Sequence, residues 1–386
     1  MFVSSPQIRL TMRGHRPFTA GLPSSTVSPS FNRQLPRLDN IPPPFGVRWS
    51  GVSPRRVATC LASALAAAGV LAGVSVVALA PGMTRGQAAP LPEQPNPAPC
   101  ETRWTMINVS PNQQQADCHL IEFPDGTKVL VDLADAADAP GVALAYLHDH
   151  KIGRIDLVVI SHFHRDHYGR LKDLIESGVP VGRVAINLPG SRELADHEQP
   201  WGMDWDDVQS VLELLRKRSI PCFTPKAGDN LVDLTTGGVR IRLEVLCAFD
   251  GIHTPFGPTD VNDTSIVLRL VHGQTRALFA GDMNHRLGSW IAQGGLDVSA
   301  ELLKVPHHGL EGCAPNAFLA RVHAKVALVP APRGLWLSER GERVRTFLAR
   351  NGIPAFVSGV HGHVTVALTE RAFTIMTEGN TWPLAP

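Results

Sequence analysis

The 386-residue sequence lacks an excess of charge of either sign, because 36 lysines and arginines balance 35 aspartates and glutamates and leave a net charge of +1. This balance excludes a strong overall attraction to nucleic acid or anionic lipid. There is also no Walker loop and no Gly-x-Ser-x-Gly motif, so nothing indicates a P-loop nucleotide site or a serine nucleophile. The six cysteines include no Cys-x-x-Cys pair, which leaves zinc-knuckle and thioredoxin-type sites without support.

The first 100 residues fall into three segments of different composition. Residues 1–56 hold eight arginines and a single acidic residue among many prolines and serines, which predicts a disordered basic leader. Residues 57–80 are 24 consecutive residues without a charge, and a membrane-spanning helix needs roughly 20 apolar residues. Residues 81–100 contain six prolines and are typical of a stiff, extended linker.

The charge-free segment 57–80 is interpreted as a single membrane-spanning anchor or as a signal peptide. Arg55 and Arg56 precede it directly, and by the positive-inside rule they place the N-terminus in the cytoplasm and the chain after Pro81 outside. We therefore expect a membrane-anchored or exported protein in which the folded domain after the segment is extracytoplasmic, either periplasmic or extracellular. An organellar transit peptide is a further alternative. A buried helix of a soluble domain is disfavoured because the segment is apolar on all sides.

Residues 101–380 are predicted to form one folded domain, because short β-rich runs and helical periodicity begin near Glu101. The runs come in two blocks, each interrupted by helices, which indicates an α+β fold with two sheets covered by helices on their outer faces. Strands are expected at residues 104–109, 119–123, 128–132, 155–160, 184–187, 239–246, 266–271, 277–280, 302–305, 324–329, 355–357 and 364–368. Helices are expected at residues 142–150, 171–176, 205–218, 316–322 and 338–351.

The strongest local signal is the run Ser-His-Phe-His-Arg-Asp-His-Tyr-Gly at residues 161–169. It directly follows the apolar run 155–160, which places it on a loop that leaves a buried strand. Three imidazoles and one carboxylate lie within six residues of this loop: His162, His164, Asp166 and His167. Neutral imidazoles and carboxylates are the ligands that zinc and similar divalent ions accept. The loop therefore predicts a metal site with enough ligands to serve two adjacent ions.

Further candidate ligands follow two later strands. Asp282 follows one of these strands, and the pair His307 and His308 follows the other. Taken alone, an aspartate at a strand end is usually a turn or capping residue, and a histidine pair in a loop is more often not a ligand. Asp132, at the end of strand 128–132, is interpreted as structural, because it can tie the neighbouring loops by hydrogen bonds.

The order of these motifs resembles the metallo-β-lactamase superfamily. The His-x-His-x-Asp-His sequence at 162–167 is that superfamily's signature, and a Gly-Asp motif at 281–282 and a His-His-Gly motif at 307–309 follow in its order. Over residues 102–370 the details look most like the hydrolase domain of ComEC-type competence proteins, including an Asn/Ser motif at 262–265. The resemblance implies a four-layer αββα sandwich and a metal-dependent hydrolase with two divalent ions. Zinc suits the ligand types, and manganese is also admitted.

The resemblance further implies two ligand sets that share the carboxylate of Asp282. The first set is His162 and His164. The second set is Asp166, His167 and one histidine of the pair His307 and His308, of which His307 is preferred.

Many superfamily members supply a histidine where this sequence has Asn262 or Asp263, so the first ion would be held more loosely or completed by water. Asp166 and Asp282 would also be catalytic, because they would orient the attacking water and accept its proton. Asn262 would stand beside them in the catalytic site.

The implied reaction is hydrolysis by a hydroxide that two ions about 3.5–4 Å apart activate. We expect a phosphodiester substrate, either a small molecule or a nucleic acid, since the resembling group is linked to nucleic-acid and phosphoester cleavage. Basic residues near the motifs would then form a groove for the substrate: Arg165, Arg170, Lys172, Lys304 and Arg333. Hydrolysis of an amide, lactone or thioester is the alternative. A non-catalytic binding module is disfavoured by the complete ligand set.

Two further groups of residues have a functional and a structural interpretation. His361 and His363 would reach the mouth of the site as proton donors, although histidines before a strand are more often turn residues. Trp201, Trp205 and Trp336 would line a pocket, although packing in the core or at the rim is favoured.

Overall fold

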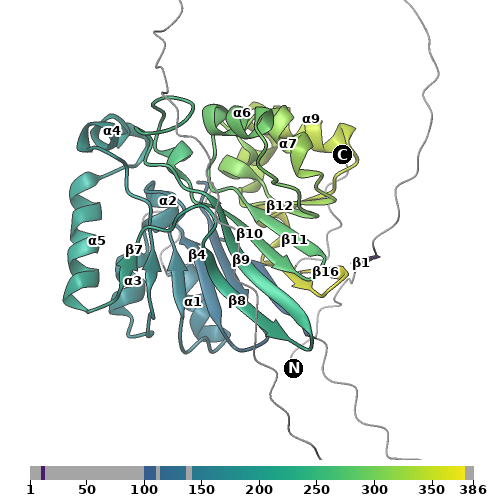
Figure 1. Cartoon of the computed structure of the whole chain (residues 1–386), viewed down its shortest axis with the longest axis horizontal. Helices are drawn as coiled ribbons and strands as arrows, with labels where there is room; N and C mark the ends of the chain where they lie inside the picture. The colour runs from purple at the N-terminus through teal and green to yellow at the C-terminus, as the bar shows by residue number, and fades with distance from the viewer. Residues whose placement is uncertain (1–9, 14–99, 110–113, 136–140, 379–386) are drawn as a thin grey trace, which may run out of the picture. The chain divides into compact units, whose positions relative to one another are not determined.

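The computed structural model describes residues 10–13, 100–109, 114–135 and 141–378 (Figure 1). The predicted leader at 1–56, apart from the four residues of one short strand, lies outside the described residues, and so do the charge-free segment 57–80 and the linker up to residue 99. The roles expected of them, including the extracytoplasmic location, stay predictions. Within the described ranges, no helix has the length and apolar composition that crossing a membrane requires.

Two sheets form the centre of the fold. Within the described part of the chain, the first sheet has nine strands. In spatial order they are β1 (Leu10–Arg13), β16 (Ala372–Thr377), β15 (Val364–Leu368), β2 (Thr102–Met106), β3 (Cys118–Glu122), β4 (Lys128–Leu133), β5 (Leu157–Val159), β6 (Val184–Ala185) and β7 (Cys222–Phe223). The second sheet, counted over the same residues, has seven strands. They are β14 (Ala355–Val357), β13 (Val326–Val329), β12 (Leu302–Lys304), β11 (Thr275–Phe279), β10 (Val267–His272), β9 (Val239–Cys247) and β8 (Asn230–Thr236).

Each sheet changes from antiparallel to parallel pairing part-way across. In the first sheet the pairs from β1 to β4 are antiparallel and those from β4 to β7 are parallel. In the second sheet the pairs from β8 to β11 are antiparallel and those from β11 to β14 are parallel. Ligands of open α/β sheets bind beyond the carboxyl ends of parallel strands. The predicted ligand loops leave β5, β11 and β12 at such ends.

Helices cover the outer face of each sheet (Figure 1). The helices are α1 (Val142–Asp149), α2 (Arg165–Tyr168), α3 (Leu171–Glu176), α4 (Arg192–His197), α5 (Trp205–Lys217), α6 (His285–Gln293), α7 (Asn316–Val322), α8 (Arg333–Leu337), α9 (Glu342–Arg350) and α10 (Ser358–His361). Short 3-10 turns are η1 (Gln199–Trp201), η2 (Asn262–Thr264), η3 (Pro306–Gly309) and η4 (Glu339–Gly341). The predicted helix at 338–351 is thus divided into η4 and α9, because the Ser338 side chain caps η4 first.

Buried apolar side chains fill the spaces between four structural layers. Side chains alternate between the two faces of a strand. In β4, Val129 lies in the cluster between the two sheets, whereas Leu130 lies in the cluster beneath α1, α3 and α5. In β12, Leu302 lies in the cluster between the sheets, and Leu303 lies in the cluster beneath α6, α7 and α9. The α+β class and the four-layer αββα sandwich are therefore confirmed.

Candidate metal centre

Asp132, at the end of β4, fixes the predicted ligand loop to the neighbouring strand. Its carboxylate accepts hydrogen bonds from the backbone N–H of Ser161 at 2.7 Å and from Ser161 Oγ at 2.8 Å. Its Oδ2 atom also lies 2.9 Å from Nδ1 of His167. A histidine that donates from Nδ1 to a carboxylate presents Nε2 as its free ligand atom. Asp132 therefore has the tying role that its position predicts, and it also orients His167.

Four side chains from three loops converge beyond the ends of β5, β11 and β12. Ligand atoms of these four residues all lie within 4.8 Å of one another: Asp166, His167, Asp282 and His308. The Nε2 atom of His308 is 3.0 Å from Asp282 Oδ2 and 3.2 Å from Asp166 Oδ2. The Nε2 atom of His167 is 3.2 Å from the same Asp282 oxygen. Two imidazoles and two carboxylates at this spacing can hold one divalent metal ion.

The electrostatics of this four-residue cluster fit a bound cation. Burial would lower the pKa of His167 and of His308, but Asp282 and the acids around it outweigh this effect and raise both pKa values well above the ordinary range. The Nε2 atom of His167 is buried and has no hydrogen-bond partner among the described residues. Metal binding replaces protons on such histidines, because the neutral imidazole is the ligand form. The donor set and its charge therefore fit a divalent ion.

The two adjacent histidines of η3 point in different directions. Both have a left-handed backbone, with φ of 49° at His307 and 54° at His308, and their rings are 68° apart in orientation. His308 Nδ1 is 2.9 Å from the carbonyl oxygen of Pro330, which leaves Nε2 facing the acids. His307 Nδ1 is instead 2.6 Å from Oδ1 of Asn284, on the wall of a pocket. This geometry corrects the preference for His307, because it places His308 in the cluster.

A second set of ligand atoms, called the first-ion set here, combines His162 and His164 of the 161–169 loop with Asn262 of η2. His162 Nε2 and His164 Nδ1 are 3.3 Å apart, and His164 Nδ1 is 3.1 Å from Oδ1 of Asn262. The adjacent Asp263 turns away, because its carboxylate accepts two backbone N–H groups at the start of α6, one of them from Asn284 at 2.7 Å. Burial and the nearby Asp260 raise the pKa of Asp263 to about 6. Of the two candidates at this position, Asn262 therefore faces the histidines.

A buried cation, Lys304 of β12, lies behind the cluster. Its ammonium pairs with Asp117, donates to the Gly281 carbonyl oxygen at 2.8 Å, and lies 3.2 Å from Oδ1 of Asp282. Burial alone would lower the pKa of Lys304, but the two carboxylates outweigh burial and hold the pKa above its ordinary value. Asp117 also lies 3.2 Å from Nδ1 of His308. The sequence prediction missed Asp117, because a lone aspartate before a strand has no local signature.

The family model of the metallo-beta-lactamase superfamily matches residues 111–329, which is more than half of the chain. The chain belongs to the metallo-β-lactamase superfamily. Together with the clustered ligands, this membership makes it a metal-dependent hydrolase. The superfamily domain is similar to ComE operon protein 3 of Bacillus subtilis (strain 168), with 22% identity over 235 residues, which are 60% of this chain and 27% of that protein. This chain therefore spans well under half of that relative's length.

Two solved structures are also similar to this metallo-β-lactamase protein at low identity. The metallo-beta-lactamase fold protein YhfI of Bacillus subtilis is 14% identical, with 67% of this chain and 96% of that chain covered and a TM-score of 0.41. Igni18, a metallo hydrolase of Ignicoccus hospitalis, is 14% identical, with 69% of this chain and 98% of that chain covered and a TM-score of 0.40. Membership in the superfamily rests on the family match.

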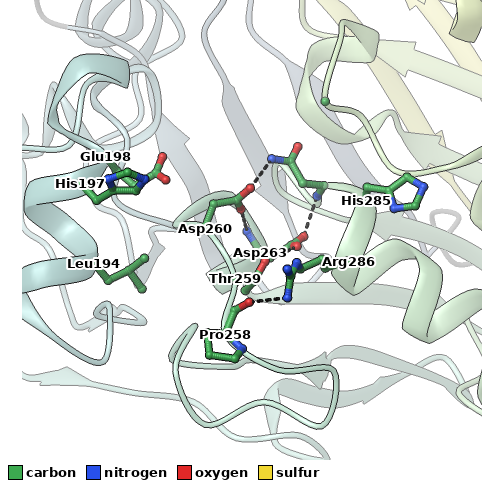
Figure 2. Close-up of a pocket in the computed structure, with 11 residues that line it drawn as sticks. Leu194, His197, Glu198, Pro258, Thr259, Asp260, Asp263, His285 and Arg286 are labelled. Atoms are coloured by element: carbon green, nitrogen blue, oxygen red, sulfur yellow. Dashed lines mark hydrogen bonds between the residues drawn. The ribbon is translucent and has the colours of Figure 1, made fainter. Parts of the chain in front are cut away.

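The metallo-β-lactamase site opens into a pocket of about 380 Å³, called the metal pocket here. Four of the candidate ligands form part of its wall: His164, Asp166, Asn262 and Asp282. The wall also contains residues outside the ligand sets, among them His197, Glu198, Trp201, Asp260, Asn284, His307, Glu311 and Arg340. A second pocket of about 430 Å³ adjoins the first and shares His197, Glu198, Asp260 and Asn284 with it. Figure 2 shows His197 and Glu198 on one wall of this adjoining pocket and Asp260 and Asp263 on the other.

The basic groove predicted for a nucleic acid does not line either pocket. Arg165 and Arg333 are exposed outside both pocket walls. Arg170 is ion-paired with Asp173, and Lys172 is ion-paired with Asp207. The fifth residue, Lys304, is buried. The five residues therefore give neither pocket a basic lining, and the groove itself stays a prediction.

The remaining candidates divide between the core and the metal pocket. His361 is buried against the backbone of β14. His363 Nδ1 accepts the backbone N–H of Asn108 at 2.9 Å. Neither side chain lines either pocket. Trp336 is buried in the cluster beneath α6, α7 and α9, and Trp205 packs, partly buried, against the cluster beneath α1, α3 and α5. Trp201 alone of the three tryptophans lies in the wall of the metal pocket.

Proposed function

We propose that this superfamily hydrolase cleaves phosphodiesters with two divalent ions held by adjoining ligand sets. One observation carries the proposal, namely that the four-residue cluster lies beside the first-ion set, with one loop supplying residues to both sets. When bound, the ions supply a polarised water and positive charge next to the substrate oxygens. Zinc suits the imidazoles, and the amide oxygen of Asn262 admits manganese as well.

The charges of the ligands favour an anionic substrate. The first-ion set consists of two imidazoles and an amide oxygen, all of them neutral. Its one source of negative charge is the carboxylate of Asp282, which it shares with the second set. The second set adds Asp166 as its own acid, and Asp282 also contacts the Lys304 ammonium. Two carboxylates neutralise only half of the charge of two divalent ions. The positive charge left over suits a phosphodiester and stabilises the additional negative charge of its transition state.

Asp166 is the carboxylate best placed to receive a proton from the attacking water. Its side chain is 17% exposed and lies in the wall of the metal pocket, whereas the Asp282 side chain is 2% exposed and contacts Lys304. A general base must reach the proton that it removes. We therefore assign proton acceptance to Asp166, with Asp282 as the shared ligand that orients the site and Asn262 as the third ligand of the first ion.

Hydrolysis of a neutral amide, lactone or thioester is the second candidate function, and the metal pocket provides one observation for it. Outside the ligand sets its wall contains the acids Glu198, Asp260 and Glu311, and Arg340 is ion-paired with Glu311 at 2.7 Å. A wall with this excess of negative charge repels a long polyanion. A phosphodiester substrate is therefore expected to be short.

Purified metal-loaded protein is expected to hydrolyse short phosphodiesters and to leave lactones and β-lactams intact. His162→Ala removes a ligand of the first ion and is expected to lower kcat/KM by more than about 100-fold, since even outer-shell partners of metals are worth roughly 10–100-fold. The assay compares a dinucleotide, single-stranded DNA, a lactone and a β-lactam. His148→Ala is the matched control, because that side chain is 90% exposed on α1. Turnover of the lactone or lactam alone would overturn the proposal.

A further inference from the structure

Trp201 combines high exposure with a place beside the metal ligands. Its relative exposure is 66%, and among the described residues the only other large hydrophobic side chain that is exposed is Leu337, at 44%. Trp201 lies in the wall of the metal pocket together with His164 and Asp166. Leu337 lies in neither pocket wall. A large aromatic ring in the wall of a pocket beside metal ligands offers its face to a molecule that binds in that pocket.

The backbone around Trp201 holds the ring next to the ligand loop. Trp201 ends η1, and its N–H donates to the Glu198 carbonyl oxygen at 2.9 Å. Gly202 follows in a left-handed conformation with φ of 103°, which favours glycine. The Gly202 carbonyl oxygen then accepts the N–H of Arg165, inside the ligand loop, at 3.2 Å. Because the turn is bonded to the loop that carries the metal ligands, the backbone of Trp201 has a fixed place relative to them.

We propose that the Trp201 indole stacks on the nucleobase of a short nucleotide substrate whose phosphodiester lies at the metal ligands. This proposal rests on the proposed phosphodiesterase function and names its substrate class. Aromatic side chains bind bases of any sequence by stacking, because every base has a π-face. His197 provides a second ring, with its centroid 6.5 Å from that of Trp201.

The adjoining pocket favours a nucleotide over a lipid phosphodiester. Its wall contains several polar or charged side chains, with Thr259, Asp260, Asp263 and Arg286 among them (Figure 2). Such groups can hydrogen-bond to the edge of a base or to a sugar in addition to their contacts within the protein, such as that of Arg286 with the Pro258 carbonyl oxygen, whereas an acyl chain offers no hydrogen-bonding group. The acidic wall of the metal pocket also limits how much polyanion can enter, which agrees with a short substrate.

The test compares a dinucleotide with the same phosphodiester lacking its bases, for the wild type, Trp201→Ala, Trp201→Phe and Leu337→Ala. Trp201→Ala is expected to lower kcat/KM for the dinucleotide by about tenfold or more, from the strength of one base stack, and to leave the base-free substrate unchanged. Trp201→Phe should restore most of the loss, and Leu337→Ala should change neither substrate. An equal loss on both substrates, or no loss on the dinucleotide, would overturn the assignment.

A binding measurement separates this inference from the proposed function. Metal-loaded wild type is expected to bind a short labelled oligothymidylate at least about tenfold more tightly than its abasic counterpart, and Trp201→Ala is expected to lose this difference. If the wild type shows the base-dependent binding but cleaves no phosphodiester, the proposed function fails while the stacking role stands. If the wild type binds both oligomers equally, the stacking role of Trp201 is refuted whatever the protein hydrolyses.

Discussion

His308→Ala is expected to retain at most one of two divalent ions per chain and to lose more than about 100-fold in kcat/KM. The reason is that Nε2 of His308 faces both Asp166 and Asp282, at 3.2 and 3.0 Å, so its removal opens the second ligand set. Outer-shell partners alone are worth roughly 10–100-fold in metal affinity or activity, and a direct ligand is worth more. Metal content of the dialysed protein, together with the dinucleotide assay, measures both effects.

The adjacent histidine provides the matched control for this experiment. His307→Ala is expected to keep both ions, because His307 Nδ1 bonds to Asn284 and its ring lies outside the four-residue cluster. Equal metal loss in the two variants would mean that the orientation of the pair is not as described. Metal loss in His307→Ala alone would restore the original preference for that residue.

Lys304→Met is expected to destabilise the metal-free protein by about 3–5 kcal/mol, the usual effect of removing one partner of a buried ion pair. The Lys304 side chain is 1% exposed, and without its ammonium the equally buried carboxylate of Asp117 loses its closest cation and keeps the imidazole of His308, 3.2 Å away. Asp282 loses a contact of 3.2 Å at the same time. Urea denaturation of the chelator-treated protein measures the free energy of unfolding.

Two controls separate loss of the ion pair from loss of packing. The double variant Lys304→Met with Asp117→Asn removes both charges of the pair and is expected to recover more than half of the lost stability. Lys325→Met replaces an exposed lysine close in sequence and should change the free energy of unfolding by no more than about 0.5 kcal/mol. A double variant no more stable than Lys304→Met would show that the charge of Lys304 has no special role.

The ligand loop could be predicted from the sequence because its signal is local. His162, His164, Asp166 and His167 follow one apolar strand within six residues, and this pattern depends on no distant partner. Asp282 was identified only from the order of motifs, because an aspartate after a strand is common. The choice between His307 and His308 depends on two successive left-handed residues, and that backbone conformation has no sequence signature in a pair of histidines.

Contacts between distant segments explain the part of the site that could not be predicted. Lys304 follows two leucines in an apolar run, and its partner Asp117 comes from the start of another strand in the other sheet. A lysine near a motif is most often exposed to solvent. The sequence therefore did not indicate that Lys304 is buried, and the residue was assigned to a basic groove. Glu198, 3.6 Å from His164 Nε2, was missed for the same reason, because its place beside the metal loop depends on how η1 folds back.

The fold was predicted well where apolar residues recur at a regular spacing and poorly where polar residues or a glycine interrupt that spacing. The predicted helices at 171–176 and 316–322 coincide with α3 and α7. The strand β8 (Asn230–Thr236) was missed, because four of its seven residues are polar and it forms an edge of its sheet. Helix α6 (His285–Gln293) was also missed, since Gly288 and several polar residues weaken its helical pattern. In the structure Gly288 allows close packing, as a Cβ atom there would lie 2.7 Å from Pro315.

Anomalous diffraction from crystals grown with zinc tests the central claim most directly, because it locates each ion without an assay. Two peaks are expected about 3.5–4 Å apart. One should lie among the four-residue cluster and the other among the first-ion set, with Asp282 between them. A fully occupied zinc position elsewhere, with no peak between Asp166 and His308, would contradict the account.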